Sequence, residues 1–175
     1  MVITLKANNL IAREIAWQII KQATYYNIRL SVVTAETFRK KGKLLSDQDR
    51  RFITMLVQGT VRLTGRLDWQ LRQAYLGKYK ELNESVRIIL RLGAYQLFYM
   101  DNVPDYAAVN TTVSLAKSLH PKYSGLVNAV LRKITKIIFT PPDKDDIKAT
   151  SNYLSHPFWL VKKWINEGRG DTVVD

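Results

Sequence analysis

The stretch NESVRIILRLGAYQLFYM, residues 83–100, would be apolar on almost every face of a helix. Asn83 is a suitable N-cap, and Arg87 and Arg91 lie four residues apart, on one stripe. A helix that is apolar nearly all round must be covered by other elements. The stretch therefore predicts the central, buried helix of an all-α protein.

Amphipathic patterns on both sides of this stretch predict further helices, because apolar residues recur there at helical spacing between capping and turn residues. Ser46 and Asp49 form a capping-box pattern at the start of one of them. No strand pattern and no long internal repeat is visible. The expected fold is a compact all-α bundle of about seven helices. Besides the central helix, these span residues 10–26, 34–41, 46–64, 66–76, 105–119 and 124–138.

Two glycines lie inside predicted helices, Gly59 and Gly93. A helix-interior glycine costs about 1 kcal/mol relative to alanine. Close approach by a neighbouring helix is the usual compensation, since a glycine has no side chain to obstruct it. We therefore expect both glycines at helix crossings.

Two asparagines, Asn110 and Asn128, follow a valine near the start of consecutive predicted helices. An amide inside a helix is mildly unfavourable, because its side chain competes for backbone hydrogen bonds. One interpretation is that both are satisfied polar groups that tie the two helices into the bundle. The alternative is direct contact with a ligand. We favour the structural interpretation.

Residues 140–146, TPPDKDD, have the composition of a linker. We expect a helical domain over residues 1–139 and, over residues 140–175, this linker and the first helix of a following segment. The expected helix lies in SHPFWLVKKWINEG, residues 155–168, and its aromatic residues need a surface to pack on.

The charge of the chain favours a polyanionic partner. The net charge is +12, from 27 lysines and arginines against 15 acidic residues, and the first hundred residues carry 17 of the basic side chains but only 7 of the acidic ones. Nucleic acid is the commonest polyanion for such a protein, although lysines kept for solubility produce a similar surplus.

Several classes of site are not indicated. The absence of cysteine excludes disulfides, thiolate metal ligands and cysteine nucleophiles. The two histidines, His120 and His156, are far apart and form no ligand pair, so we predict no metal site. The N-terminus lacks the pattern of a secretory signal, and no run of apolar residues is long enough to span a membrane, so we expect a cytoplasmic protein.

Four stretches in register resemble the NusB-type helical domain, in the form found at the N-terminus of Sun/RsmB-type ribosomal RNA cytosine methyltransferases. The resemblance spans about residues 10–137 and is carried by AREIAWQII, DRRFITMLVQGTVRLTGRLDWQL, VRIILRLGAYQLFYMDNVPDYAAVNTTVSLAK and LVNAVLRKI. It implies RNA binding. It also implies a parent enzyme that uses S-adenosylmethionine and a cysteine nucleophile to methylate carbon 5 of cytosine. This chain has no cysteine, so we expect no catalytic residue in it and expect the parent's own C-terminal catalytic domain as a partner.

The sequence departs from the family pattern in the first helix, after Asn110, and in its last ten residues, NEGRGDTVVD. NusB-type factors begin the first helix with an arginine cluster that meets RNA, whereas here Arg13 alone matches and Lys6 is a distant substitute. Thr111 stands where the family has an acidic residue after the asparagine.

We predict an RNA-binding surface in which Arg62, Arg66 and Arg72 point outward and Lys6 and Arg13 extend it. An alternative for any of these arginines is to cap a helix or to pair with Asp68. Three functions remain open: an RNA-positioning domain of a ribosomal RNA methyltransferase, which we favour, a free-standing transcription antitermination factor, or a scaffold that docks on its own catalytic domain.

Overall fold

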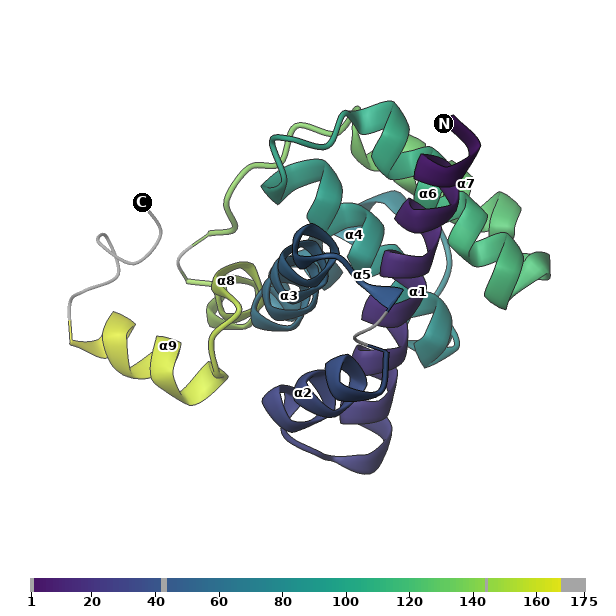
Figure 1. Cartoon of the computed structure of the whole chain (residues 1–175). Helices are drawn as coiled ribbons and strands as arrows, with labels where there is room; N and C mark the ends of the chain where they lie inside the picture. Colours follow the sequence, from purple (N-terminus) through teal and green to yellow (C-terminus); the bar gives the residue numbers. More distant parts are fainter. Residues whose placement is uncertain (1, 42–43, 144, 168–175) are drawn as a thin grey trace.

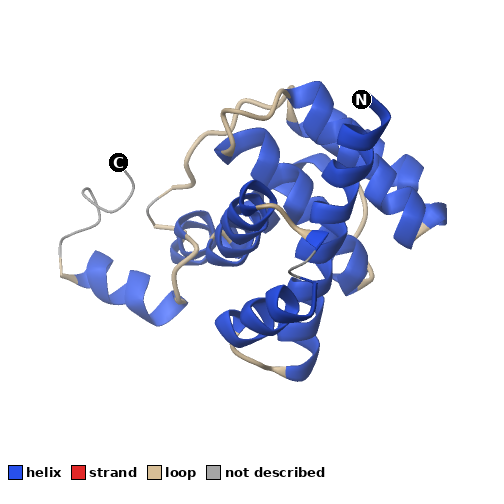
Figure 2. Ribbon diagram, in the orientation of Figure 1, coloured by secondary structure: helices blue, strands red, loops and turns tan. Residues whose placement is uncertain are grey.

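The computed structural model describes residues 2–41, 44–143 and 145–167, and of residues 2–9 the backbone alone. Every regular element in these ranges is helical (Figure 2), which confirms the all-α prediction. The α-helices are α1 (Val2–Tyr26), α2 (Leu30–Lys41), α3 (Asp47–Arg62), α4 (Thr64–Ala74), α5 (Glu84–Tyr99), α6 (Asp105–Leu119), α7 (Ser124–Ile134), α8 (Ile147–Leu154) and α9 (Phe158–Asn166), with short 3-10 turns η2 (Tyr79–Glu81) and η3 (Pro121–Tyr123).

Helix α5 runs through the middle of the bundle and contacts α1, α3, α4, α6 and α7 (Figure 1). Eleven of its sixteen residues are buried, which confirms the prediction of a central helix. Asn83 caps it, since the backbone N–H of Ser85 donates a 2.9 Å hydrogen bond to Asn83 Oδ1. The capping box of α3 is confirmed too: Asp49 N–H donates to Ser46 Oγ, and Ser46 N–H donates to Asp49 Oδ2.

Gly59 and Gly93 lie where α5 meets its neighbours. A Cβ atom on Gly59, in α3, would overlap the ring of Tyr95, in α5. A Cβ atom on Gly93 would lie 2.7 Å from Leu131 Cδ1 of α7 and 3.0 Å from Thr112 Cγ2 of α6. Neither position has room for a side chain unless a neighbour moves.

Some helix boundaries differ from the predicted ones. Helix α1 begins at Val2 instead of residue 10, and α2 begins at Leu30 instead of residue 34. Helix α7 ends at Ile134, although the apolar pattern continues to residue 138. The pattern continues because Ile137 and Phe139 still pack on the core from a non-helical segment.

Helix α8 was missed by sequence reasoning because it is only eight residues long and of mixed polarity. Asp146 caps it, with Oδ1 accepting a 2.9 Å hydrogen bond from the N–H of Ala149. Ser155 ends it in the left-handed conformation, at φ 55°. Helix α8 packs on α4, where Arg66 N–H donates a 2.8 Å hydrogen bond to Ser155 Oγ. The segment after the linker therefore returns to the bundle, and the domain boundary near residue 140 stays a prediction.

Candidate nucleic-acid interface

Arg13 does not extend an outward basic surface, as the sequence had suggested. Its side chain is only 3% exposed, its Nε donates a 2.7 Å hydrogen bond to Gln96 Oε1, and its guanidinium lies 4.8 Å from the centroid of the Phe52 ring. Burial lowers the pKa of Arg13 to about 10. Arg13 therefore joins α1 to α5 inside the bundle. The side chain of Lys6, the other predicted contact on α1, lies outside the described residues.

Arg62 and Arg72 line two different hollows of the surface. Arg62 is exposed and lines a hollow of about 400 Å³ with Met55 and Tyr95. Arg72 is also exposed, but it lines a different hollow beside η2, 5.9 Å from the centroid of the Tyr79 ring. The two hollows have no lining residue in common. Contact of Arg62 and Arg72 with RNA stays a prediction.

Arg66 holds α8 against α4. Its guanidinium lies 4.0 Å from the centroid of the Tyr153 ring, and its Nη2 donates a 2.9 Å hydrogen bond to the Tyr153 hydroxyl. The side chain is half-buried by these contacts. We therefore correct the expectation that Arg66 points outward toward phosphates.

Asp68 pairs with Arg91 and not with Arg62, Arg66 or Arg72. Arg91 Nε donates to Asp68 Oδ1 at 2.7 Å, and Arg91 Nη2 donates to Asp68 Oδ2 at 2.9 Å. The Tyr79 hydroxyl donates a third hydrogen bond to Asp68, at 2.8 Å. Burial alone would lower the pKa of Arg91, but the hydrogen bonds and charge of Asp68 outweigh it and raise that pKa. Burial and the charge of Asp68 also raise the pKa of Tyr79.

The two asparagines do not join helices, so the structural interpretation favoured from the sequence needs correction. Asn110 lies on the exposed side of α6. Asn128 is half-buried, and its Oδ1 accepts a 3.0 Å hydrogen bond from Nε of Arg132, in the same helix. Contact of either residue with a ligand stays open.

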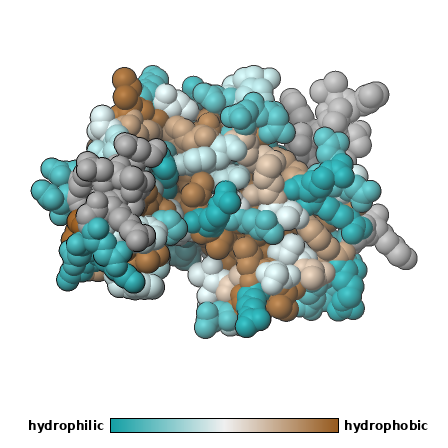
Figure 3. All heavy atoms as spheres, turned by 90° about the vertical axis from the view of Figure 1, so that its left-hand side faces the viewer, coloured by the Kyte–Doolittle hydropathy of each residue, from teal (hydrophilic) through white to brown (hydrophobic). Residues whose placement is uncertain are grey.

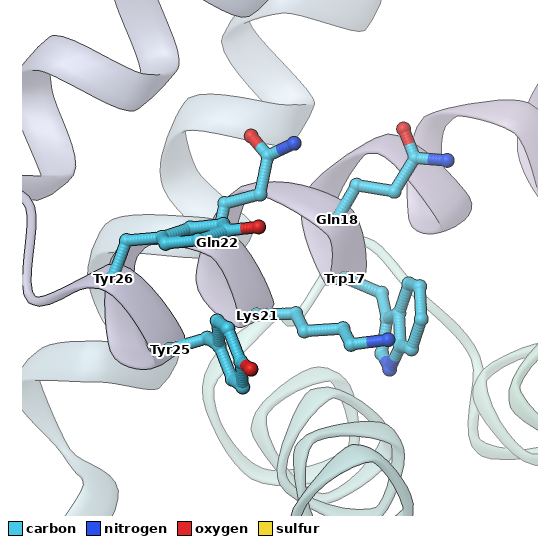
Figure 4. Close-up of a pocket in the computed structure, with 6 residues that line it drawn as sticks. All are labelled: Trp17, Gln18, Lys21, Gln22, Tyr25 and Tyr26. Carbon is cyan, nitrogen blue, oxygen red and sulfur yellow. The ribbon is translucent and has the colours of Figure 1, made fainter.

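A hollow of about 590 Å³ lies along the C-terminal half of α1 (Figure 4). We call it the tyrosine pocket, and two rows of residues spaced four apart line it. Such spacing places each row on one side of a helix. Figure 4 shows Trp17, Lys21 and Tyr25 on one side and both glutamines on another. The rows are Trp17, Lys21, Tyr25 and Gln18, Gln22, Tyr26.

The side chains of the tyrosine pocket combine aromatic rings with a positive charge. Tyr25 and Tyr26 are 77% and 65% exposed, and their ring centroids lie 4.9 Å apart in an edge-to-face arrangement. Lys21 Nζ lies 4.7 Å from the centroid of the Trp17 ring. Trp17 is only 7% exposed and belongs to the hydrophobic core. The sequence analysis did not single out Tyr25 and Tyr26. The two rows at four-residue spacing were the signal that could have revealed them.

Beyond Trp17, the aromatic residues continue onto the α6–α7 connection. The His120 ring lies 6.2 Å from the Trp17 ring and 6.4 Å from the Tyr123 ring, between centroids. Partial burial lowers the pKa of His120, and the nearby charges of Lys21 and Lys122 lower it further. Cations from α1 and η3 therefore flank this end of the pocket.

Residues 10–136 match the NusB family. This span contains the tyrosine pocket and the bundle through α7. The chain belongs to the NusB family. Its resemblance to the NusB-type domain, noted from the sequence, is thereby confirmed.

The NusB-family chain is similar to several curated proteins that are much longer. It is 34% identical to the probable ribosomal RNA small subunit methyltransferase B of Bacillus subtilis (strain 168) over 157 residues, which cover 88% of this chain and 34% of that protein. It is 35% identical to the protein of the same name from Synechocystis sp. over 155 residues, which cover 86% of this chain and 34% of that protein. It is 30% identical to ribosomal RNA small subunit methyltransferase B of Escherichia coli O1:K1 / APEC over 157 residues, which cover 86% of this chain and 34% of that protein. The chain thus spans about a third of the length of these relatives.

Two further properties bear on the kind of site. Within the described ranges, no helix is both long and apolar enough to cross a membrane. No three histidine or acidic side chains among the described residues are grouped so as to hold a metal ion.

Proposed function

We propose that this NusB-family chain binds and positions ribosomal RNA for a small-subunit methyltransferase, in the cytoplasm, and carries no catalytic residue itself. The names of its relatives and its net charge of +12 support RNA as the partner. The reaction we propose for the parent protein is the S-adenosylmethionine-dependent methylation of cytosine at carbon 5.

The residues of this chain do not fit that cofactor or that chemistry. The sequence has no cysteine to attack the cytosine ring. Gly59 and Gly93 are enclosed at helix contacts, and the described ranges contain no strand from which a glycine-rich turn could lead into a helix. We therefore assign S-adenosylmethionine to another part of the parent enzyme.

The length of the alignment with the methyltransferases distinguishes between a methyltransferase domain and an antitermination factor. The NusB match covers residues 10–136, with only nine residues before it. The alignment with the Bacillus subtilis protein covers 88% of the chain, so it must continue past α7 toward α8. Similarity outside the NusB region supports a domain of a methyltransferase over a free-standing antitermination factor.

Helix α9 offers a surface for the remaining part of such an enzyme. Phe158 and Trp159 are 50% and 67% exposed, while Val161 on the same helix is buried. Figure 3 looks onto the side of the molecule that carries α8 and α9, where hydrophobic groups are exposed among hydrophilic ones. Exposed aromatic side chains are frequent at protein interfaces. We propose that the catalytic domain of the same protein covers Phe158 and Trp159.

The RNA-binding proposal can be tested with the 175-residue chain and a fluorescent fragment of small-subunit ribosomal RNA. We expect affinity to fall steeply with salt, because each phosphate contact releases a counterion. Arg62→Glu and Arg72→Glu should each weaken binding and lower the logarithmic salt slope by about one unit. Lys136→Glu, which changes an exposed residue just after α7, is the control and should behave like wild type.

Two results would count against the proposal at different levels. A wild-type chain that does not bind the RNA at any salt concentration would reject RNA binding. Binding by wild type that neither arginine variant alters would keep the function and remove Arg62 and Arg72 from the interface.

A further inference from the structure

We propose that the tyrosine pocket holds an unpaired nucleotide, so that this chain prefers single-stranded over duplex RNA. The inference rests on the proposed function and specifies which form of RNA the site takes. Three properties of the pocket carry it: exposed rings, amide groups at the rim, and a surplus of positive charge.

The exposed rings match the faces of a base. Tyr25 and Tyr26 keep most of their surface in water, although large aromatic side chains are usually covered. Their edge-to-face contact leaves ring faces open at the end of α1. Every nucleic-acid base has a flat face that stacks on such rings.

The glutamines provide groups that a base edge can use. A glutamine side chain carries both a donor and an acceptor, like the Watson–Crick edges of bases. Lys41, from α2, donates a 3.0 Å hydrogen bond to Gln18 Oε1 and so orients its amide. Gln22 is exposed one turn further along the same row.

The charges around the pocket suit a phosphate backbone. Lys21 lies in the pocket, and Lys41 lines the adjoining hollow between α1 and α2. Glu36, the acidic residue of that hollow, is paired with Lys40 at 2.6 Å, so these two charges offset each other. Lys122 adds a further positive charge beyond Trp17. Positive charge next to exposed rings is the usual composition of a single-strand binding surface.

The conformation of the RNA follows from the geometry of the rings. In an A-form duplex the bases are stacked on one another, and their faces are not available to protein side chains. Apart from the terminal pair at each end of a duplex, only an unpaired nucleotide can place its base on Tyr25 or Tyr26. A protein partner is the other possible occupant, but the described residues that line the pocket are aromatic, amide-bearing or cationic, with none aliphatic, so we favour RNA.

The test compares two labelled RNAs, a single strand of about ten nucleotides and a fully paired duplex of the same length. Binding to the wild-type chain and to a Tyr25→Ala/Tyr26→Ala variant is measured by fluorescence anisotropy. We expect the variant to bind the single strand at least about tenfold more weakly, with its affinity for the duplex unchanged. The Tyr25→Phe/Tyr26→Phe variant keeps both rings and should bind the single strand nearly as wild type does.

The matched control is Tyr106→Ala. Tyr106 is 73% exposed, like the pocket tyrosines, but it lies at the start of α6, about 20 Å along the helix from His120. This variant should bind both RNAs as wild type does. Lys21→Ala should weaken single-strand binding and lower its salt slope by about one unit, whereas loss of the tyrosines should leave that slope unchanged.

The outcomes separate this inference from the proposed function. If wild type binds RNA but the alanine double variant retains full affinity for the single strand, or loses affinity for both RNAs equally, the pocket is not a site for unpaired nucleotides. The proposed RNA binding would then still stand. If wild type binds neither RNA, both proposals fail. Thermal unfolding of each variant shows whether it is folded, and the phenylalanine variant decides the question if the alanine variant is not.

Discussion

The guanidinium of Arg91 forms two hydrogen bonds with the carboxylate of Asp68, of 2.7 and 2.9 Å, and so links the central helix α5 to α4. Both side chains are about nine-tenths covered, with 10% and 11% of their surface exposed. Glu84 adds a further contact, since its Oε1 accepts a hydrogen bond from Arg91 Nη1 at 2.8 Å. The pair gives the buried guanidinium of Arg91 both hydrogen-bond acceptors and an opposite charge.

We therefore predict that Asp68→Ala strongly destabilises the fold. Removing one partner of a buried ion pair typically costs about 3 to 5 kcal/mol, because the other charge stays buried, and Glu84 should keep the loss near the lower end of that range. Urea unfolding of wild type and variant measures it. Glu36→Ala removes an exposed pair with Lys40 and should change stability little. Similar losses in both variants would mean that the Asp68–Arg91 pair has no special structural role.

Gly93→Ala should lower the melting temperature, because the overpacking of this buried contact outweighs the gain of about 1 kcal/mol that alanine has over glycine in a helix. The added Cβ atom would lie 2.7 Å from Leu131 Cδ1, and overpacking of a core costs about 1 to 3 kcal/mol. Gly125→Ala, in α7, is the matched control, because a Cβ atom there would meet nothing within 4 Å. That control should melt at the wild-type temperature or slightly above it, since alanine favours helix. Identical melting temperatures for the two variants would contradict the close contact at Gly93.

The lowered pKa of His120 predicts a loss of stability in weakly acidic solution. Partial burial, and then the charges of Lys21 and Lys122, lower this pKa below the usual value of 6.5. As the pH falls through 6.5, the unfolded chain takes up the proton more readily than the folded one, so the free energy of unfolding decreases. The His120→Gln variant should lose less stability than wild type between about pH 7.5 and about pH 5.5. Urea unfolding at each pH measures both losses. If wild type and the His120→Gln variant lose the same stability between the two pH values, His120 does not contribute.

Arg66→Ala should loosen α8 without unfolding the bundle. The side chain of Arg66 joins α4 to α8 through its hydrogen bond and ring contact with Tyr153, which alanine removes, while the backbone hydrogen bond to Ser155 remains. A small peripheral helix can open locally while the core stays folded. Hydrogen exchange should show faster exchange of amides in residues 147–154 and unchanged exchange in α5. Arg62→Ala, which changes an exposed arginine, should leave both regions as in wild type. Unaltered protection of α8 in the Arg66 variant would assign the attachment of α8 to other contacts.

The chain should show no binding of S-adenosylmethionine at micromolar concentration. The reason is that the described ranges contain no strand that leads through a glycine-rich turn into a helix, the usual place for such a cofactor. Titration calorimetry checks this directly. Heat of binding that saturates in the micromolar range would overturn the proposal that the chain is non-catalytic.

Features that depend on neighbouring residues could be predicted from the sequence. Helical spacing predicted α5 and its central position, and the caps at Ser46 and Asn83 follow from residues two or three positions away. Helix α8 shows the limit of this reasoning, because packing against α4 stabilises a segment too short and too polar to be predicted by its own pattern.

The sequence by itself thus determined the helical class, the buried centre and the positive charge of this protein, because these depend on composition and local periodicity. The tertiary structure decided which charges are free to meet a ligand. Arg13 bonds to Gln96 across 83 positions of sequence, so no local pattern could show that it is buried. The rows that end in Tyr25 and Tyr26 are visible in the sequence, but only the packing of the other helices leaves them exposed. Local patterns set which faces a helix has, and contacts between distant segments decide which of those faces remains open to solvent.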